Sequence, residues 1–383
     1  MHLPRNDCAV ALTQIPVWHS IRVVLNGLCI VLETVHILPF GAEHMKRTVS
    51  ILFTLLLSLP FFAAAQDKDP LKLAATIPLP GLKDGDFDHF AADIDGHRLF
   101  LTAEENDKLE ILDTKTNQLL HTMQEIKAPH AILFRKDLKK LFVVEGDASA
   151  VKIYDSETYK PLGEAKVSID ADSIAYDAAT SNLYVVNGGR EAHTPYSLIS
   201  VIDTNNAKKL RDIKIPSDHV EAITLEKSGP RMFINITGQN AVGVMDRNKS
   251  ELGAKWPLPA GDKLNVAMAF DEANHRLFVV TRNPGKLIVM NSDDGKVIAD
   301  LPAVGMVDDA AYDAQHKRIY LAGDQFLDVF EQKDADHYAL LARIPGAFRA
   351  KTGILVPELN RYYLAVPHHA GKEAEVRVYD IQP

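Results

Sequence analysis

Short runs of alternating apolar and polar residues dominate the chain from residue 71 onward. No long segment has the 3.6-residue apolar period of a helix, so the pattern indicates β-strands. One phrase recurs, in which a basic or polar pair precedes an aliphatic, an aromatic and a further aliphatic residue. Its aromatic residue occurs seven times, 42 to 49 residues apart, at Phe100, Phe142, Tyr184, Phe233, Phe278, Tyr320 and Tyr363. This recurrence predicts seven copies of one structural unit.

A second phrase follows each copy of the first. It has two apolar residues and then a turn-forming polar residue, as in Ile111-Leu112-Asp113 and Val201-Ile202-Asp203. Asp or Asn at that place bonds to the backbone two residues on and begins a tight turn. Each unit therefore indicates four short antiparallel strands, which at this length are typical of propeller blades. We predict an all-β fold, a single seven-bladed β-propeller; a pair of β-sandwiches is the alternative, which the even spacing disfavours.

The two ends of the repeat complement each other. The seventh unit stops at Pro383, directly after its third strand, and residues 71–78 form one strand that belongs to no other unit. We expect this N-terminal strand to complete blade seven and close the ring, which removes an exposed sheet edge.

The residues before the repeat have the features of a targeting segment. Met45-Lys46-Arg47 precedes an apolar run over residues 49–62, and Ala63-Ala64-Ala65 fits a small-residue cleavage site. We interpret residues 45–65 as a signal peptide cleaved near Ala65, and residues 66–383 as a periplasmic or secreted propeller. Residues 1–44 are interpreted as a mis-started upstream segment or a disordered leader. We expect the propeller to be a monomer without a membrane span.

Composition narrows the chemistry. Both cysteines, Cys8 and Cys29, precede the propeller, so we expect it to contain no disulfide. The formal net charge is −9 at pH 7, and residues 66–383 carry 38 Lys+Arg against 48 Asp+Glu, a net charge of −10. An acidic surface repels polyanions, so nucleic-acid binding is disfavoured. The sequence has neither a Gly-rich phosphate loop that opens a helix nor a Gly-x-Ser-x-Gly elbow.

The repeat resembles a known family. Residues 201–210, Val-Ile-Asp-Thr-Asn-Asn-Ala-Lys-Lys-Leu, and the preceding Tyr184-Val-Val-Asn187 are similar to the YncE-like, or YVTN-repeat, β-propellers. The resemblance covers nearly all of residues 71–383. It implies the propeller fold and a family that includes surface and periplasmic proteins without assigned chemistry, with lactonases as distant relatives and with some nucleic-acid binders.

Alignment of the seven units suggests a candidate site. In a propeller the first strand of each blade lines the central channel, and the alignment brings one residue of each unit to the same place. These residues are His89, His130, Asp172, Glu221, Val266 with Asn265 beside it, Asp308 and Lys351. Loops on the same face add Arg190, His193, Arg282 and His368. Three interpretations remain open: a water-filled channel with a polar rim, a ligand pocket, or a metal site.

The metal interpretation has its own candidates. His89, His130 and Glu221, with Asp172 and His368 as further candidates, combine imidazole with carboxylate, a set that suits zinc, copper, iron or nickel. No short metal motif is present, so no cofactor is predicted and a divalent metal stays an alternative. The loop Asp84-Gly-Asp86-Phe-Asp88-His89 is interpreted as a solvated turn, with a cation-binding loop as its alternative.

The favoured function is binding or scaffolding. The channel mouth would bind a small molecule, a peptide or a protein. The alternative is a lactonase-like hydrolase at the same mouth, with His89 or His130 as general base and Glu221 orienting it or holding a cation. No catalytic residue is identified from the sequence, and single-stranded nucleic acid is the least favoured ligand.

Overall fold

The computed structural model describes residues 21–25, 28–32 and 69–383. The predicted signal peptide, residues 45–65, lies outside the described residues. The chain divides into two units, residues 1–67 and residues 68–383. In the first unit, β1 (Ile21–Leu25) and β2 (Leu28–Leu32) pair antiparallel. The second unit contains the repeat.

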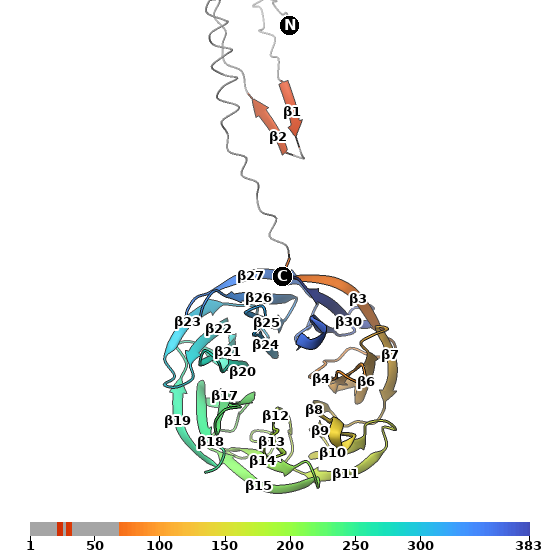
Figure 1. Ribbon diagram of the computed structural model, residues 1–383, viewed down its shortest axis with the longest axis vertical. Helices are drawn as coiled ribbons and strands as arrows, with labels where there is room; N and C mark the ends of the chain where they lie inside the picture. The colour runs from red at the N-terminus through yellow and green to blue at the C-terminus, as the bar shows by residue number, and fades with distance from the viewer. Residues whose placement is uncertain (1–20, 26–27, 33–68) are drawn as a thin grey trace, which may run out of the picture. The chain divides into compact units, whose positions relative to one another are not determined.

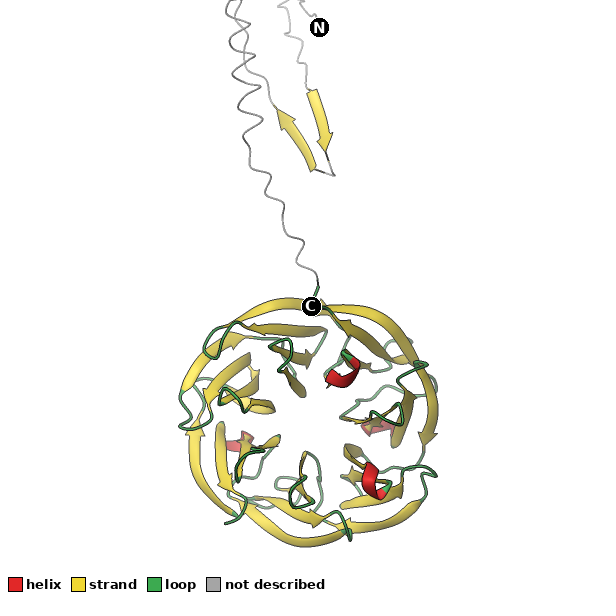
Figure 2. Ribbon diagram, in the orientation of Figure 1, coloured by secondary structure: helices red, strands yellow, loops and turns green. Residues whose placement is uncertain are grey.

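Seven four-stranded antiparallel sheets surround a central channel, which confirms the predicted seven-bladed β-propeller (Figure 1). Within the described residues, helical structure is confined to four short 3-10 segments (Figure 2). No helix of these residues has the length and apolar character needed to cross a membrane.

In each blade the strands run in order from the channel to the circumference. Blades one to three are β4 (Phe90–Asp93), β5 (Arg98–Ala103), β6 (Lys108–Asp113), β7 (Gln118–Met123); β8 (Pro129–Arg135), β9 (Lys140–Glu145), β10 (Ala150–Asp155), β11 (Pro161–Lys166); and β12 (Ile174–Asp177), β13 (Asn182–Gly188), β14 (Ser197–Asp203), β15 (Lys208–Ile215).

The remaining blades repeat this order. Blades four to seven are β16 (Ile223–Leu225), β17 (Arg231–Ile236), β18 (Ala241–Asp246), β19 (Glu251–Pro257); β20 (Lys263–Asp271), β21 (Arg276–Asn283), β22 (Gly285–Asn291), β23 (Val297–Pro302); β24 (Asp309–Asp313), β25 (Arg318–Gly323), β26 (Phe326–Gln332), β27 (Tyr338–Pro345); and β28 (Thr352–Val356), β29 (Arg361–Val366), β30 (Ala374–Ile381) with β3 (Leu71–Leu79).

The N-terminal strand closes the ring as expected. β3 pairs antiparallel with β30, with Leu71 opposite Ile381 and Ile77 opposite Val376. Ile77 and Val376 are completely buried. Blade seven is therefore built from both ends of the repeat, and no blade lacks its outer strand (Figure 1).

The recurring aromatic residue fills the space between neighbouring blades. All seven aromatic side chains are buried on the second strands. Phe100 of blade one packs 5.7 Å from Phe134 of blade two, and Phe278 of blade five packs 5.3 Å from Tyr312 of blade six, measured between ring centroids. Large rings bury much apolar area in one contact, so the aromatic phrase marks the contact between blades.

The basic residue of the same phrase makes a second kind of contact between blades. An arginine at the start of the second strand donates to a backbone carbonyl just beyond the third strand of the next blade. The pairs are Arg98 to Ser156, Arg231 to Ser292, Arg318 to Gln382 and Arg361 to Thr114. The last pair joins blade seven to blade one, so the same bond also spans the closure.

Every outer strand carries an irregularity in its pairing. In all seven blades the register between the third strand and the outer strand shifts by one residue. Leu120, Leu162 and Leu210 are the extra residues in three of these bulges, and each is about half exposed. A bulge breaks the regular row of backbone groups that an edge strand presents.

Arg98→Ala is expected to destabilise the propeller. Arg98 donates to Asp93, at 2.8 and 3.0 Å, as well as to the next blade, and Asp93 is only 4% exposed. Removal of the guanidinium leaves a buried carboxylate unpaired, which costs about 3 kcal/mol. Chemical denaturation measures the loss; Lys115→Ala, on an exposed turn, is the control. A loss below about 0.5 kcal/mol for Arg98→Ala would contradict the structural role.

Candidate functional site

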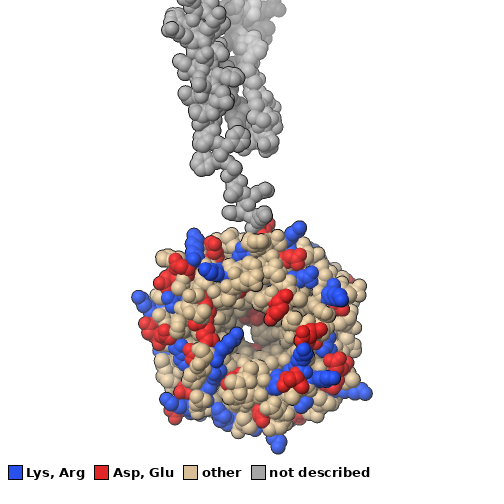
Figure 3. All heavy atoms as spheres, in the orientation of Figure 1, with Lys and Arg blue, Asp and Glu red and all other residues tan. Residues whose placement is uncertain are grey.

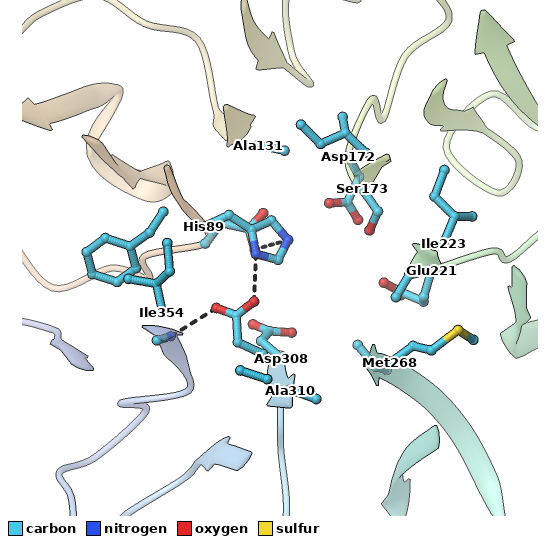
Figure 4. A pocket seen from close by; sticks show the side chains of 18 of the residues that line it. His89, Ala131, Asp172, Ser173, Glu221, Ile223, Met268, Asp308, Ala310 and Ile354 are labelled. Carbon is cyan, nitrogen blue, oxygen red and sulfur yellow. Dashed lines mark hydrogen bonds and ion pairs between the residues drawn. The ribbon is translucent and has the colours of Figure 1, made fainter. Parts of the chain in front are cut away.

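The first strands surround a cavity of about 340 Å³ in the mouth of the channel (Figure 4). Its wall is acidic, and the titratable side chains that line it are Asp88, His89, Asp172, Glu221, Asp308 and Asp309. Apolar residues of the strands, including Ile223, Met268 and Ile354, complete the lining. Figure 3 shows charges of both signs around one face and an opening at its centre. Of the predicted ring, His89, Asp172, Glu221, Val266 and Asp308 thus share one cavity.

Asp88 is held rigidly before the first strand of blade one. The Thr352 hydroxyl of blade seven donates to the Phe87 carbonyl at 3.0 Å, and the His89 backbone N–H donates to the Thr102 hydroxyl at 2.8 Å. Asp86 is 3% exposed and Asp88 is 7% exposed. The interpretation of residues 84–89 as a solvated turn was therefore wrong for Asp86 and Asp88, whereas Asp84 is exposed. The loop is drawn inward because its carboxylates face basic side chains of neighbouring blades.

The Thr102 hydroxyl also fixes the second histidine. It donates to the His130 carbonyl at 2.9 Å, so one completely buried side chain contacts the backbone of both His89 and His130. This arrangement sets the spacing between the first strands of blades one and two.

Carboxylates and imidazoles alternate across four blades. His89 Nδ1 lies 3.0 Å from Asp309 Oδ1, and its Nε2 lies 3.5 Å from Asp88 Oδ1. The other Asp88 oxygen lies 2.6 Å from His130 Nδ1, which is 3.8 Å from Asp172 Oδ1. Asp309 is oriented in turn by the Gly353 N–H at 2.9 Å (Figure 4).

These contacts shift the pKa values of the groups involved. Burial opposes the charge of each histidine, but Asp88, Asp309 and Asp172 more than offset it and raise the pKa of both His89 and His130. Burial likewise opposes the charge of Asp88, yet the two histidines hold its pKa below the usual range. For Asp172 the outcome is the reverse, since burial and the charge of Asp88 raise its pKa well above normal.

Glu104, a partly exposed acid, lies near Asp88. Burial and the nearby Asp88 raise the pKa of Glu104 to about 7.

The basic candidates form an ion-pair network at the side of the cavity. Asp308 contacts both Arg282 and Lys351. Lys351 Nζ also lies 3.2 Å from Asp86, and Arg282 Nε donates to the Val307 carbonyl at 3.0 Å. Arg282 and Lys351 therefore neutralise Asp308, and Lys351 also neutralises Asp86.

A second cavity of about 270 Å³ adjoins the first. Asp172 and Glu221 belong to both linings, and Glu221 Oε1 lies 2.7 Å from His219 Nε2. Arg190 lines this cavity and a third of about 370 Å³, next to Asp218 and His219. The predicted Arg190 thus belongs to the same face but to the neighbouring hollow.

Six predicted residues do not belong to these linings: His130, Arg282 and Lys351, whose contacts are given above, and Asn265, His368 and His193. Asn265 is completely buried and donates to Asn235 and to the Ala241 carbonyl, so it is a structural residue between blades four and five. His368 is bonded to Asp84 on the rim. His193 donates its backbone N–H to Arg190 within the loop between β13 and β14.

The histidine and carboxylate groups that converge differ from the predicted metal set. Among the described residues, Asp88, His130 and Asp172 bring one ligand atom each within 4.8 Å of one another. Of the predicted set, His130 and Asp172 are in this group; His89 is bonded to Asp309 and Glu221 to His219. Sequence reasoning missed Asp309, and it considered Asp88 only within the acidic loop whose alternative interpretation was cation binding.

Comparisons with known proteins agree with the fold. No protein-family model matches the chain. The chain is 25% identical over 189 residues to "Uncharacterized protein YncE" of Salmonella typhimurium, and equally to that of Salmonella typhi; the match covers 47% of this chain. The chain spans about half the length of these curated relatives, 49%.

Solved structures show a similar architecture at low identity. A chain of the Kuenenia stuttgartiensis hydrazine synthase structure has a TM-score of 0.66 at 16% identity, with 78% of this chain and 98% of that chain covered. The WD40 repeats of RRP9 have a TM-score of 0.65 at 11% identity, with 82% and 100% covered. Such likenesses show the fold alone.

His130→Gln is expected to lower stability in a pH-dependent way. The folded protein raises the pKa of His130 from 6.5 to about 10, so its contribution is complete below pH 6.5 and disappears as pH rises through about 10. The loss should be about 2 kcal/mol below pH 6.5, as for a hydrogen bond between charged groups, and should shrink at higher pH. Denaturation of metal-free protein across this range measures it. A loss that is the same at every pH would contradict the ion pair, and the exposed His337→Gln is the control.

Proposed function

Since the chain is a YncE-like seven-bladed β-propeller, we propose that it is a binding protein that holds a small, positively charged ligand in the mouth of its central channel. The observation that carries the proposal is the charge of the cavity wall. Five carboxylates line the cavity of about 340 Å³, and His89 is the single basic side chain of that lining. Concave sites with convergent polar groups are the usual places for small ligands, and this volume is within their range.

The five carboxylates differ in their ion-pair partners. Arg282 and Lys351 neutralise Asp308, and the histidines neutralise Asp88 and Asp309. Within residues 69–383, Asp172 and Glu221 have histidine as their ion-pair partner, and no lysine or arginine. Negative charge concentrated in a low-dielectric hollow attracts cations.

The raised pKa of Asp172 also supports a cationic ligand. Burial, the charge of Asp88 and the charge of Glu221 disfavour its ionised form. A cation in the cavity would favour that form, because opposite charges at short range lower the pKa of an acid. Ligand binding would then release protons, which calorimetry in buffers of different ionisation enthalpy detects.

The charge preference can be tested with simple probes. Titration calorimetry with putrescine and zinc chloride as cations, succinate as anion and glucose as neutral solute should show binding of the cations alone. Glu221→Gln keeps the hydrogen bond with His219 but removes one charge, and should weaken putrescine binding about 10-fold. Glu358→Gln, exposed at the other end of the first strand of blade seven, should change nothing.

Two results would overturn the proposal. One is binding of succinate in preference to both cations. The other is cation binding that is equally strong in wild type and in a Glu221→Gln, Asp172→Asn double variant.

We also propose that the propeller acts outside the cytoplasm. Support comes from the basic, apolar and small-residue succession over residues 45–65. Expression of the full chain in a Gram-negative host should yield a periplasmic protein whose intact mass corresponds to a first residue of Gln66. A cytoplasmic protein that retains residues 45–65 would contradict this.

A further inference from the structure

We propose that the cation is a divalent transition metal, bound at the channel wall by Asp88, His130 and Asp172. The inference rests on the proposed function and names the chemical class of its ligand. The three residues come from the entry to blade one, from β8 of blade two and from the segment before β12 of blade three. Side chains 42 residues apart along the repeat thus converge on one point.

The distances suit a metal ion. His130 Nδ1 lies 2.6 Å from Asp88 Oδ2 and 3.8 Å from Asp172 Oδ1, and all three ligand atoms lie within 4.8 Å of one another. Bonds of about 2.1 Å from zinc to nitrogen or oxygen place tetrahedral ligands about 3.4 Å apart. Side-chain movements shorter than one such metal–ligand bond would bring the three ligand atoms to that spacing.

The carboxylate of Asp172 is accessible to a ligand, since its side chain is 28% exposed. Among residues 69–383, no donor forms a hydrogen bond with its carboxylate, and the contact with His130 is long at 3.8 Å. Solvent or a ligand can therefore supply the partner that the protein does not. The open side of Asp172 faces the cavity shared with Glu221 (Figure 4).

The other two ligands are held in place before any metal arrives. Thr352 and Thr102 bond to the residues on either side of Asp88, and Thr102 also bonds to the backbone of His130. The imidazole of His130 lies against Gly146, where the Cβ of any larger residue would come within 2.9 Å of Nε2. Glycine at 146 thus leaves room for the ring with Nδ1 directed at the carboxylates.

The donor set favours a particular class of metal. One imidazole with two carboxylates suits zinc, manganese or iron better than calcium, which prefers six or more oxygen ligands. Three protein ligands leave at least one coordination position, which here would face the cavity. His89 and Lys351 are the nearby bases, and Asp309 and Asp308 contact them.

The experiment is calorimetric titration of chelator-treated full-length protein with zinc chloride, with calcium chloride and putrescine titrated in parallel. The wild type should bind one equivalent of zinc and bind calcium far more weakly. Asp172→Asn and His130→Gln should each weaken zinc binding at least about 100-fold, since each removes one of three ligands. His337→Gln is the matched control, because it removes an exposed histidine 2.8 Å from Asp334 on a distant turn.

Gly146→Ala provides a second test that leaves the ligands unchanged. Its methyl group displaces the His130 ring and should weaken zinc binding about 10-fold, while circular dichroism shows that the fold is retained. Asp172→Asn should likewise weaken zinc binding without unfolding the protein, because the Asp172 carboxylate accepts no hydrogen bond from a protein donor.

The outcomes separate this inference from the proposed function. Equal zinc affinity in wild type, Asp172→Asn and His130→Gln overturns the metal site. Putrescine binding without zinc binding in the wild type overturns the metal site and leaves the cation-binding function. Binding of neither overturns both. Zinc binding that His130→Gln abolishes, with putrescine binding changed less than about 3-fold, establishes coordination rather than general attraction by the acidic wall.

Discussion

The pairing of β3 with β30 is the interaction on which the candidate site depends. It closes the ring, and it also brings the loop after β3 against blade seven. Thr352 then bonds to Phe87, and Lys351 and Arg349 contact Asp86, although more than 260 residues separate them along the chain. These contacts between blade seven and residues 86 and 87 fix the position of Asp88 and His89. The site is therefore a product of closure, because no single blade contains its components.

The repeat made the fold predictable, and the same repeat made only part of the site predictable. The aromatic residues mark equivalent strands, so alignment by Phe100, Phe142 and their counterparts identified which positions face the channel, including His89, Asp172, Glu221 and Asp308. The alignment could not predict the hydrogen-bond or ion-pair partner of each side chain. By its spacing from the aromatic residue, Asp88 itself is equivalent to His130 and Asp172, whereas the alignment had placed His89 there. Asn265 donates to Asn235 of the adjacent blade. These partners depend on contacts between blades, and the spacing of a repeat carries no information about them.

In the channel mouth, carboxylates and imidazoles alternate, so most of the charges are paired at short distance. Asp309, His89, Asp88 and His130 neutralise one another in sequence, and Arg282 and Lys351 do the same for Asp308. Rigid pairing of this kind removes most of the freedom of the charged side chains before a ligand enters, which reduces the entropy cost of binding. The remaining carboxylates, Asp172 and Glu221, lie where the first cavity meets the second.

The displaced register of all seven outer strands has a consequence for the molecule in a crowded compartment. A propeller has as many free sheet edges as blades, and a flat edge can recruit a strand from another molecule into a continuous sheet. Here each edge is interrupted where Leu120, Leu162, Leu210 and their counterparts bulge outward. The circumference thus resists edge-to-edge association into a continuous sheet. The two faces at the ends of the channel remain as the surfaces for specific contacts.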